Sequence, residues 1–438
     1  MRLLAALFLI ALLAVSALPE IAAAPKGPAL TRAVLDNGLT VIVAENHAAE
    51  IVTLNAWAKV GSRDETDELN GAAHFVEHML FKGTRRRKPG QIDREVEGIG
   101  GILNASTSFD YTQYYIVAAS RFFDRILDIQ ADALMNSTFD PEEMERERRV
   151  VLEEIGRRDD VPTTLATKVL YTTAYRVHPY RRPVGGTREV LQSITRDQLF
   201  AFYRGHYGPQ NVIVIVAGDV NPQEVIARVR RAYGAWRRPT IARPPASPEP
   251  AFGEVRRSDL EQDVRVAYLQ MGWIGPSARD REVYAMDVLL FALGRGRSSR
   301  FTQRLRERQR LVQDVSASFP TGLDPLLFQV SAVVEPQDVA RAEAAILAEI
   351  TDIRDNGIGP EELERAKTLL LAGDAIGAHT SRGLAELLGA SATIADLNFA
   401  VTYEDQINRV TREDVQQAAR RYLDPQRYAV TVVRPRSR

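Results

Sequence analysis

The chain has 438 residues, of which 45% are hydrophobic and 26% are charged, and its formal net charge is −1. A chain of this length suits roughly two to four domains. The balanced charge argues against a surface for nucleic acid or for an anionic membrane. The sequence contains no cysteine, which excludes disulfides, thiolate ligands and a thiol nucleophile. Any bound metal must therefore be held by His, Asp or Glu.

The first 23 residues have the pattern of a secretory signal peptide. Arg2 is followed by the apolar run LLAALFLIALLAVSAL and then by an alanine-rich stretch. The apolar run is short for a membrane span. We therefore expect cleavage near Ala23 and export, to the periplasm in a Gram-negative cell, of a mature chain without a membrane span. An uncleaved membrane anchor is the alternative.

The rest of the chain contains segments typical of strands and segments typical of helices. Three segments rich in β-branched residues read as strands, namely 38–46, 51–60 and 211–220. A helix is expected to begin at Pro141 after the capping Asp140 and to continue to Gly156. A second helix is expected after the capping Thr411. This grouping predicts an α+β fold, with helices packed on one face of a largely antiparallel sheet.

A proline-rich segment at 237–250, RRPTIARPPASPEP, divides the chain. Its composition is typical of a stiff linker between domains. We predict an N-terminal domain over 24–236 and a C-terminal domain over 251–438.

The two predicted domains resemble each other. Residues 140–155 are similar to 359–374, and residues 194–220 are similar to 410–433, at nearly the same offset along the chain. Two matches in the same order make chance similarity between helices an unsatisfactory explanation. The pattern indicates an internal duplication, with two copies of one α+β fold in tandem.

The motif GAAHFVEHMLFKGT places His74, Glu77 and His78 close together. On a helix, positions i, i+3 and i+4 share one face, so two imidazoles and a carboxylate can point toward the same ion. A catalytic zinc takes three protein ligands and leaves one position for water. The third ligand must therefore come from elsewhere, and the residues alone leave several acids of the helix after Asp140 open: Glu142, Glu143, Glu145, Glu147, Glu153 and Glu154.

This motif resembles the inverted zinc motif of the M16 peptidases, the family of pitrilysin, insulysin and the mitochondrial processing peptidase. The resemblance covers nearly all of the mature chain. It includes GGILNASTSFDYTQYY, HPYRRPVGG, NVIVIVAGDV and LGRGRSSRFTQRLRERQRLV. It implies two tandem domains of the LuxS/MPP type that form half of a clamshell, as in the short bacterial subunits of the family.

The resemblance also implies the roles of individual residues. His74 and His78 correspond to the first two zinc ligands, and Glu154 corresponds to the third, with one Zn²⁺ per chain. Glu147 would lie outside the ligand set and would hold His74 in place or maintain the electrostatic field around the ion. Glu77 would act as the general base in the hydrolysis of peptide bonds.

Further expectations concern the substrate. The segment GILNASTSFDYTQYY alternates like one strand, and in the family the matching strand is an open edge that pairs with the peptide, which places Asn104 and Ala105 there. The degenerate half of related enzymes supplies an Arg and a Tyr. The corresponding residues here are Arg306 and Gln313, so the tyrosine is missing.

The second half carries no histidine pair, and Gly373 stands where the first half has Glu154. We expect this half to bind no metal. The missing tyrosine favours a dimer, either with a sister M16 subunit that carries the Arg/Tyr pair or with a second copy. A catalytically silent structural subunit of an envelope complex is the alternative function.

Overall fold

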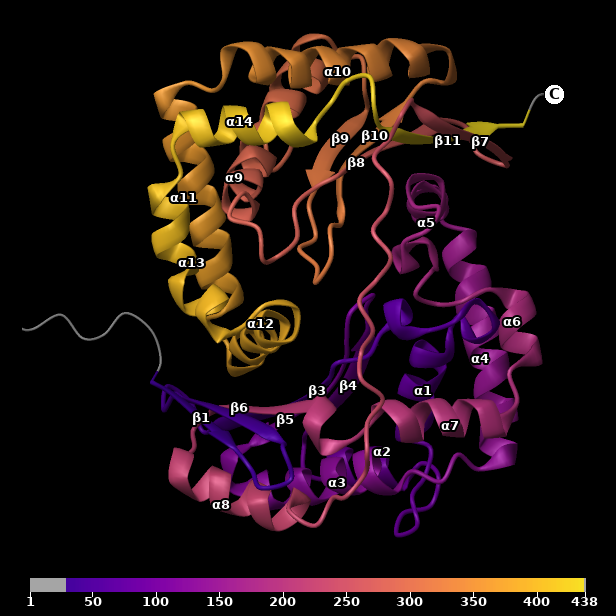
Figure 1. Ribbon diagram of the computed structural model, residues 1–438, viewed down its shortest axis with the longest axis vertical. Helices are drawn as coiled ribbons and strands as arrows, with labels where there is room; N and C mark the ends of the chain where they lie inside the picture. The colour runs from indigo at the N-terminus through magenta and orange to yellow at the C-terminus, as the bar shows by residue number, and fades with distance from the viewer. Residues whose placement is uncertain (1–28, 437–438) are drawn as a thin grey trace, which may run out of the picture.

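The computed structural model describes residues 29–436, so the predicted signal peptide lies outside the described residues. The chain forms two halves, each with one β-sheet and its own helices (Figure 1).

The first half contains a six-stranded sheet in the order β1-β2-β6-β3-β5-β4. Its strands are β1 Leu30–Val34, β2 Thr40–Glu45, β3 Ile51–Ala58, β4 Ile102–Thr107, β5 Thr112–Ala119 and β6 Val212–Gly218. Strands β2 and β6 pair in parallel, and the other neighbours are antiparallel. The three strands predicted from the sequence are confirmed as β2, β3 and β6.

Helices cover one face of this sheet. The helices of the first half are α1 Ala72–Leu80, α2 Gln91–Glu97, α3 Phe123–Asn136, α4 Pro141–Asp159, α5 Pro162–Ala174, α6 Arg188–Ser193, α7 Arg196–His206 and α8 Pro222–Tyr233, and α5 is the one among them that packs on the other sheet. Helix α3 packs on β3 and β5, and α1 packs beside β4. The predicted start of α4 is confirmed, because the Asp140 carboxylate accepts hydrogen bonds from the backbone N–H groups of Glu142 and Glu143.

The second half repeats this arrangement with a five-stranded sheet in the order β7-β11-β8-β10-β9. Its strands are β7 Arg256–Gln262, β8 Ala267–Ile274, β9 Asp314–Ser318, β10 Leu327–Val334 and β11 Ala429–Pro435. The last strand β11 lies parallel to β7 and antiparallel to β8, as β6 of the first half lies parallel to β2 and antiparallel to β3. The predicted tandem α+β fold with largely antiparallel sheets is confirmed.

The helices of the second half are α9 Val283–Leu293, α10 Val339–Asn356, α11 Pro360–Gly377, α12 Ser381–Ile394, α13 Leu397–Arg409 and α14 Arg412–Tyr422. The predicted capping Thr411 accepts a hydrogen bond from the backbone N–H of Asp414 at the start of α14. Among the described residues, no single helix has the length and apolarity of a membrane span, although the bent pair formed by α12 and α13 reaches that composition when taken together.

Each half contributes a helix that covers the free face of the other half's sheet. Helix α12 packs on β3 and β6, and α5 packs on β8 and β11 (Figure 1). Leu384 and Leu388 of α12 join an apolar cluster with Trp57 on β3. A Cβ atom at Gly389 would lie 2.0 Å from the Trp57 ring, so only glycine permits this approach. The helices on one face predicted from the sequence are therefore complemented on the other face by an exchanged helix.

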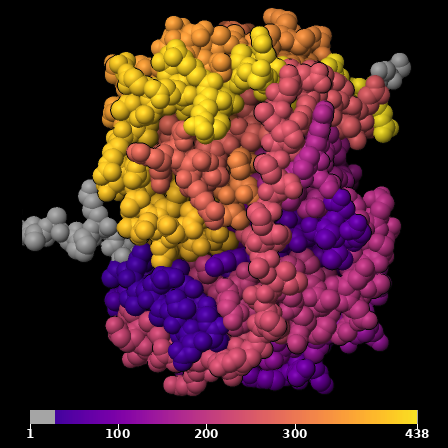
Figure 2. Space-filling view, viewed as in Figure 1, coloured from indigo at the N-terminus to yellow at the C-terminus, as the bar shows by residue number. Residues whose placement is uncertain are grey.

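The segment between Tyr233 and Arg256 has neither helix nor strand and contains the predicted linker. It runs across the surface from one half to the other (Figures 1 and 2). Side chains hold it against the first half. Arg243 binds the Asp64 carboxylate at 2.8 Å, and Glu249 accepts hydrogen bonds from three consecutive backbone N–H groups at 176–178.

A buried polar cluster locks the two halves together near this segment. The Arg63 guanidinium, whose side chain is 4% exposed, donates to the Asp324 carboxylate of the second half at 2.6 Å. His178 lies 3.3 Å from the same carboxylate. The Asp110 carboxylate accepts a hydrogen bond from the backbone N–H of Leu323. We call Arg63, Asp110, His178 and Asp324 the interdomain cluster.

The interdomain cluster predicts a pH dependence of stability. Burial raises the pKa of Asp324, but His178 and Arg63 outweigh burial and lower this pKa to about 2. The stabilisation from Asp324 is therefore complete above the unfolded-state pKa near 3.9 and is lost as the pH falls toward 2. In denaturant unfolding, Asp324→Asn should be less stable than the wild type by about 2 kcal/mol at pH 5, and this difference should shrink toward zero at pH 2.

Asp197→Asn is the control for this prediction, because the Asp197 side chain is 92% exposed and contacts only the neighbouring Arg196 among the described residues. Its difference from the wild type should stay near zero throughout. A difference for Asp324→Asn that does not change with pH would contradict the assignment.

Candidate metal centre

Helix α1, which carries His74, Glu77 and His78, is anchored by a carboxylate from outside the helix. Its first residue follows Gly71, which has φ 101° and no side-chain cap. The Glu65 carboxylate instead accepts hydrogen bonds from the backbone N–H groups of Gly71 and Ala73 at 2.9 and 2.8 Å, which satisfies donors that a helix start leaves free. Burial raises the pKa of Glu65 to about 8, although the N–H donors oppose this shift.

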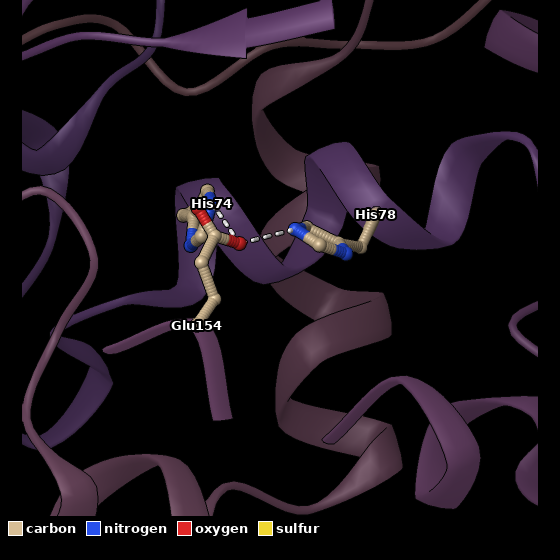
Figure 3. Close-up of side chains that lie close together, drawn as sticks. All are labelled: His74, His78 and Glu154. Atoms are coloured by element: carbon tan, nitrogen blue, oxygen red, sulfur yellow. Dashed lines mark ion pairs between the residues drawn. The ribbon is translucent and has the colours of Figure 1, made fainter. Parts of the chain in front are cut away.

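His74, His78 and Glu154 converge on one point (Figure 3). The Glu154 Oε2 atom lies 3.7 Å from His74 Nε2 and 3.5 Å from His78 Nε2. A tetrahedral zinc with bonds near 2.0–2.2 Å separates its ligand atoms by about 3.4 Å, so the two distances from Glu154 Oε2 fit such an ion, and all three ligand atoms lie within 4.8 Å of one another. Within residues 29–436 this is the single group of metal-ligating side chains so arranged.

Two of the three side chains, His74 and Glu154, have the protonation state that a bound cation needs. Burial and the neighbouring His78 lower the pKa of His74 to about 4, so its imidazole is neutral at pH 7. The hydrogen bond with His78 lowers the pKa of Glu154 to about 2. Burial lowers the pKa of His78, but its Glu147 and Glu154 neighbours outweigh burial and raise it to about 9. A metal ion that binds here must displace that proton.

Glu147 holds His78 rather than His74. Its Oε2 atom lies 3.1 Å from His78 Nδ1, and its Oε1 atom accepts a hydrogen bond from Lys82 at 2.8 Å. The alternative that Glu147 holds His74 is wrong, because Glu147 precedes Glu154 by two helical turns on α4 and so reaches the C-terminal end of α1. Contact at Nδ1 leaves His78 Nε2 to face Glu154.

Glu77 lies beside this group but is not one of its three members. It is largely buried, and burial raises the pKa of its carboxyl group. The Thr107 hydroxyl of β4 donates a hydrogen bond to Glu77 Oε2 at 2.5 Å. A buried carboxylate with a raised pKa and one hydrogen-bond donor is suited to accept and return a proton.

Arg158 is a residue of the site that we did not predict from the sequence. Its guanidinium lies 2.6 Å from Glu154 Oε1, the oxygen that faces away from the two histidines. Arg158 follows Glu154 by four residues on α4, and this i, i+4 spacing is the signal that could have identified it. Arg158 therefore fixes the carboxylate whose other oxygen faces the candidate metal position.

The predicted substrate strand is a hairpin. The segment 101–115 is predicted to form one strand, but β4 ends at Thr107 and β5 begins at Thr112, with a turn between them. Strand β4 is the last strand of its sheet and pairs only with β5 within the described chain. Asn104 is exposed on it and Ala105 is half-buried.

The predicted residues of the second half do not contact the candidate metal centre. Arg306 lies in a π-helical turn and is near Glu307 and Asp314, each at 3.8 Å. Gln313 donates a hydrogen bond to Glu335 at 2.9 Å. Gly373 is exposed on α11.

Comparisons of the sequence and the structure with known proteins all point to the same family. Residues 40–188 match the family described as insulinase (peptidase family M16), and residues 193–370 match the peptidase M16 inactive domain. An uncharacterised zinc protease of Streptomyces coelicolor is 32% identical over 92% of this chain and 89% of its own. One of Mycobacterium leprae is 32% identical over 94% of this chain and 93% of its own. The crystal structure of a protease from Helicobacter pylori superposes with a TM-score of 0.89 at 28% identity, over 93% of this chain and 100% of that chain.

The contact between Arg158 and Glu154 predicts an effect on zinc affinity. Arg158→Gln should bind zinc about tenfold more weakly than the wild type in a chelator competition, because outer contacts of this kind orient the ligand. Arg157→Gln is the matched control, since Arg157 is exposed on the same helix and lies 3.9 Å from Glu153. Equal zinc affinities for the two variants would contradict the role of Arg158.

Proposed function

This chain belongs to the insulinase family of M16 peptidases, and from that premise we propose that it is a zinc metalloendopeptidase acting on unfolded peptides or short polypeptides. The observation that carries the proposal is the convergence of His74, His78 and Glu154 on one point, with Glu77 beside them. The complete ligand set also speaks against the alternative of a catalytically silent structural subunit.

The residues of the chain have distinct tasks in this reaction. His74, His78 and Glu154 would hold a zinc ion, which when bound would supply an activated water and polarise the peptide carbonyl. Glu77 accepts a proton from the attacking water and then donates it to the leaving amine. Thr107 occupies one oxygen of Glu77, which leaves Oε1 for this transfer. Glu147 and Arg158 hold His78 and Glu154 in place.

The edge strand β4 is the proposed place for the peptide. Its outer backbone groups have no partner strand within the described chain, so an extended peptide can add to the sheet there. Asn104 and Ala105 lie in the middle of β4, and the strand ends at Thr107, which contacts Glu77. A peptide bound along β4 would therefore lie close to the proposed base, Glu77.

The second half is proposed to act without a metal of its own. It matches the inactive domain of the family over most of its length, and Gly373 offers no ligand. We assign Arg306 to substrate binding in the homodimer alternative, where it would act at the metal centre of the second copy, because it does not contact the metal centre of its own chain. The signal-like residues 1–23 support export to the periplasm.

The first prediction of this proposal concerns Glu77. Glu77→Gln should keep one zinc per chain, because Glu77 is not a ligand, and should lower peptidase activity by a factor on the order of 100 to 10,000. The measurement is cleavage of a quenched peptide pool beside elemental analysis of zinc. Loss of zinc in this variant would show that Glu77 acts as a ligand, and undiminished activity would exclude it as the base.

The second prediction concerns the missing tyrosine at Gln313. As the zinc-bearing subunit of a pair, the purified chain should bind zinc and gain activity on the order of 100-fold when a sister M16 subunit with the Arg/Tyr pair is added. Size-exclusion chromatography would report the assembly and the peptide assay its activity. Full specific activity of the chain alone, as monomer or homodimer, would rule out the requirement for a sister subunit.

A further inference from the structure

We infer that Thr107 is a positioning residue that fixes Glu77 and links its orientation to the open edge of β4. Thr107 is the last residue of β4, and its hydroxyl lies 2.5 Å from Glu77 Oε2. The inference rests on the proposed peptidase function. It adds a residue that is not a metal ligand and does not belong to the motif on α1.

The direction of the hydrogen bond follows from the neighbouring groups. The Thr112 hydroxyl donates to the backbone carbonyl of Val60 at 2.9 Å, so its proton is already used. Thr107 lies 3.4 Å from Thr112, across the strand pair. The Glu77 carboxylate is an acceptor, and Thr107 is therefore the donor to it. Because both hydroxyl protons are used elsewhere, the 3.4 Å approach of Thr107 to Thr112 is a contact and not a hydrogen bond, and the bond from Thr107 to Glu77 is what joins β4 to α1.

Glu77 depends on this one contact for its orientation. Within the described chain, Thr107 is the one group that forms a hydrogen bond with the Glu77 carboxylate. A glutamate side chain has three rotatable bonds, and its terminal torsion is broad, so burial alone does not fix the direction of its oxygens. Displacement of a reacting group by about 1 Å can lower a rate by about 100-fold.

The same strand carries both the proposed peptide edge and Thr107. Side chains alternate along β4: Leu103 and Ala105 pack toward the core that contains α1, and Thr107 follows on that face. Asn104 and Ser106 are exposed on the other face. A peptide that pairs with the backbone of β4 orders the strand whose terminal side chain holds Glu77. Loss of the hydroxyl should therefore affect the chemical step more than peptide binding.

The test compares Thr107→Val, which keeps the shape without the hydroxyl, with Thr107→Ser, which keeps the hydroxyl. In the active assembly, Thr107→Val should lower kcat by about 10- to 100-fold and leave KM within about twofold. Thr107→Ser should recover most of kcat, and zinc content should be the same in all variants. Thr351→Val is the control, because within the described chain the half-buried Thr351 hydroxyl bonds only to the carbonyl of Leu347 on α10.

The outcomes separate this inference from the proposed function. A zinc-loaded wild type that cleaves no peptide, with or without a sister subunit, overturns the proposed function and the inference with it. If the wild type is active, Glu77→Gln abolishes that activity and Thr107→Val leaves it unchanged, the inference alone is overturned. Equal loss of zinc and activity in Thr107→Val and Thr107→Ser would assign Thr107 a merely structural role and also overturn it.

Discussion

The position of helix α1 is the constraint on which the candidate site depends. Phe75, Val76 and Met79 are buried on one side of this short helix, and the opposite side presents the polar residues to α4. The buried Glu65 carboxylate fixes the start of the helix through two backbone N–H groups. A helix of nine residues has little stability of its own, so packing and this anchor determine where its side chains point.

The sequence predicted the parts of the site that depend on local geometry. The i, i+3, i+4 spacing on α1 and the start of α4 after Asp140 both follow from helical periodicity and capping, and both are found in the structure. The choice of Glu154 among the acids of α4 needed the family resemblance, because it depends on how two distant helices pack. The structure brings Glu154 to the two histidines and turns Glu147 toward His78.

Other features could not be predicted because they arise only from tertiary contacts. Glu65 caps a helix that begins seven residues later, and Thr107 reaches Glu77 from a different layer of the fold. The turn between β4 and β5 was missed, since the alternation of apolar residues continues through a segment that reverses direction. The exchange of α5 and α12 between the halves was also missed, because the sequence of a helix does not determine by itself which sheet the helix will cover.

This exchange gives the second half a structural role in the first half, since α12 covers the first sheet. The position that matches Glu154 lies on an exposed face of α11, where Gly373 has open space around it, so ligands can be lost there without damage to the core. Helix α12 by contrast buries Trp57 and neighbouring residues of the first sheet, at roughly 1.5–3 kcal/mol for each large side chain. The interdomain cluster further joins the halves through Arg63 and Asp324. Both contacts oppose separation of the two halves within one chain.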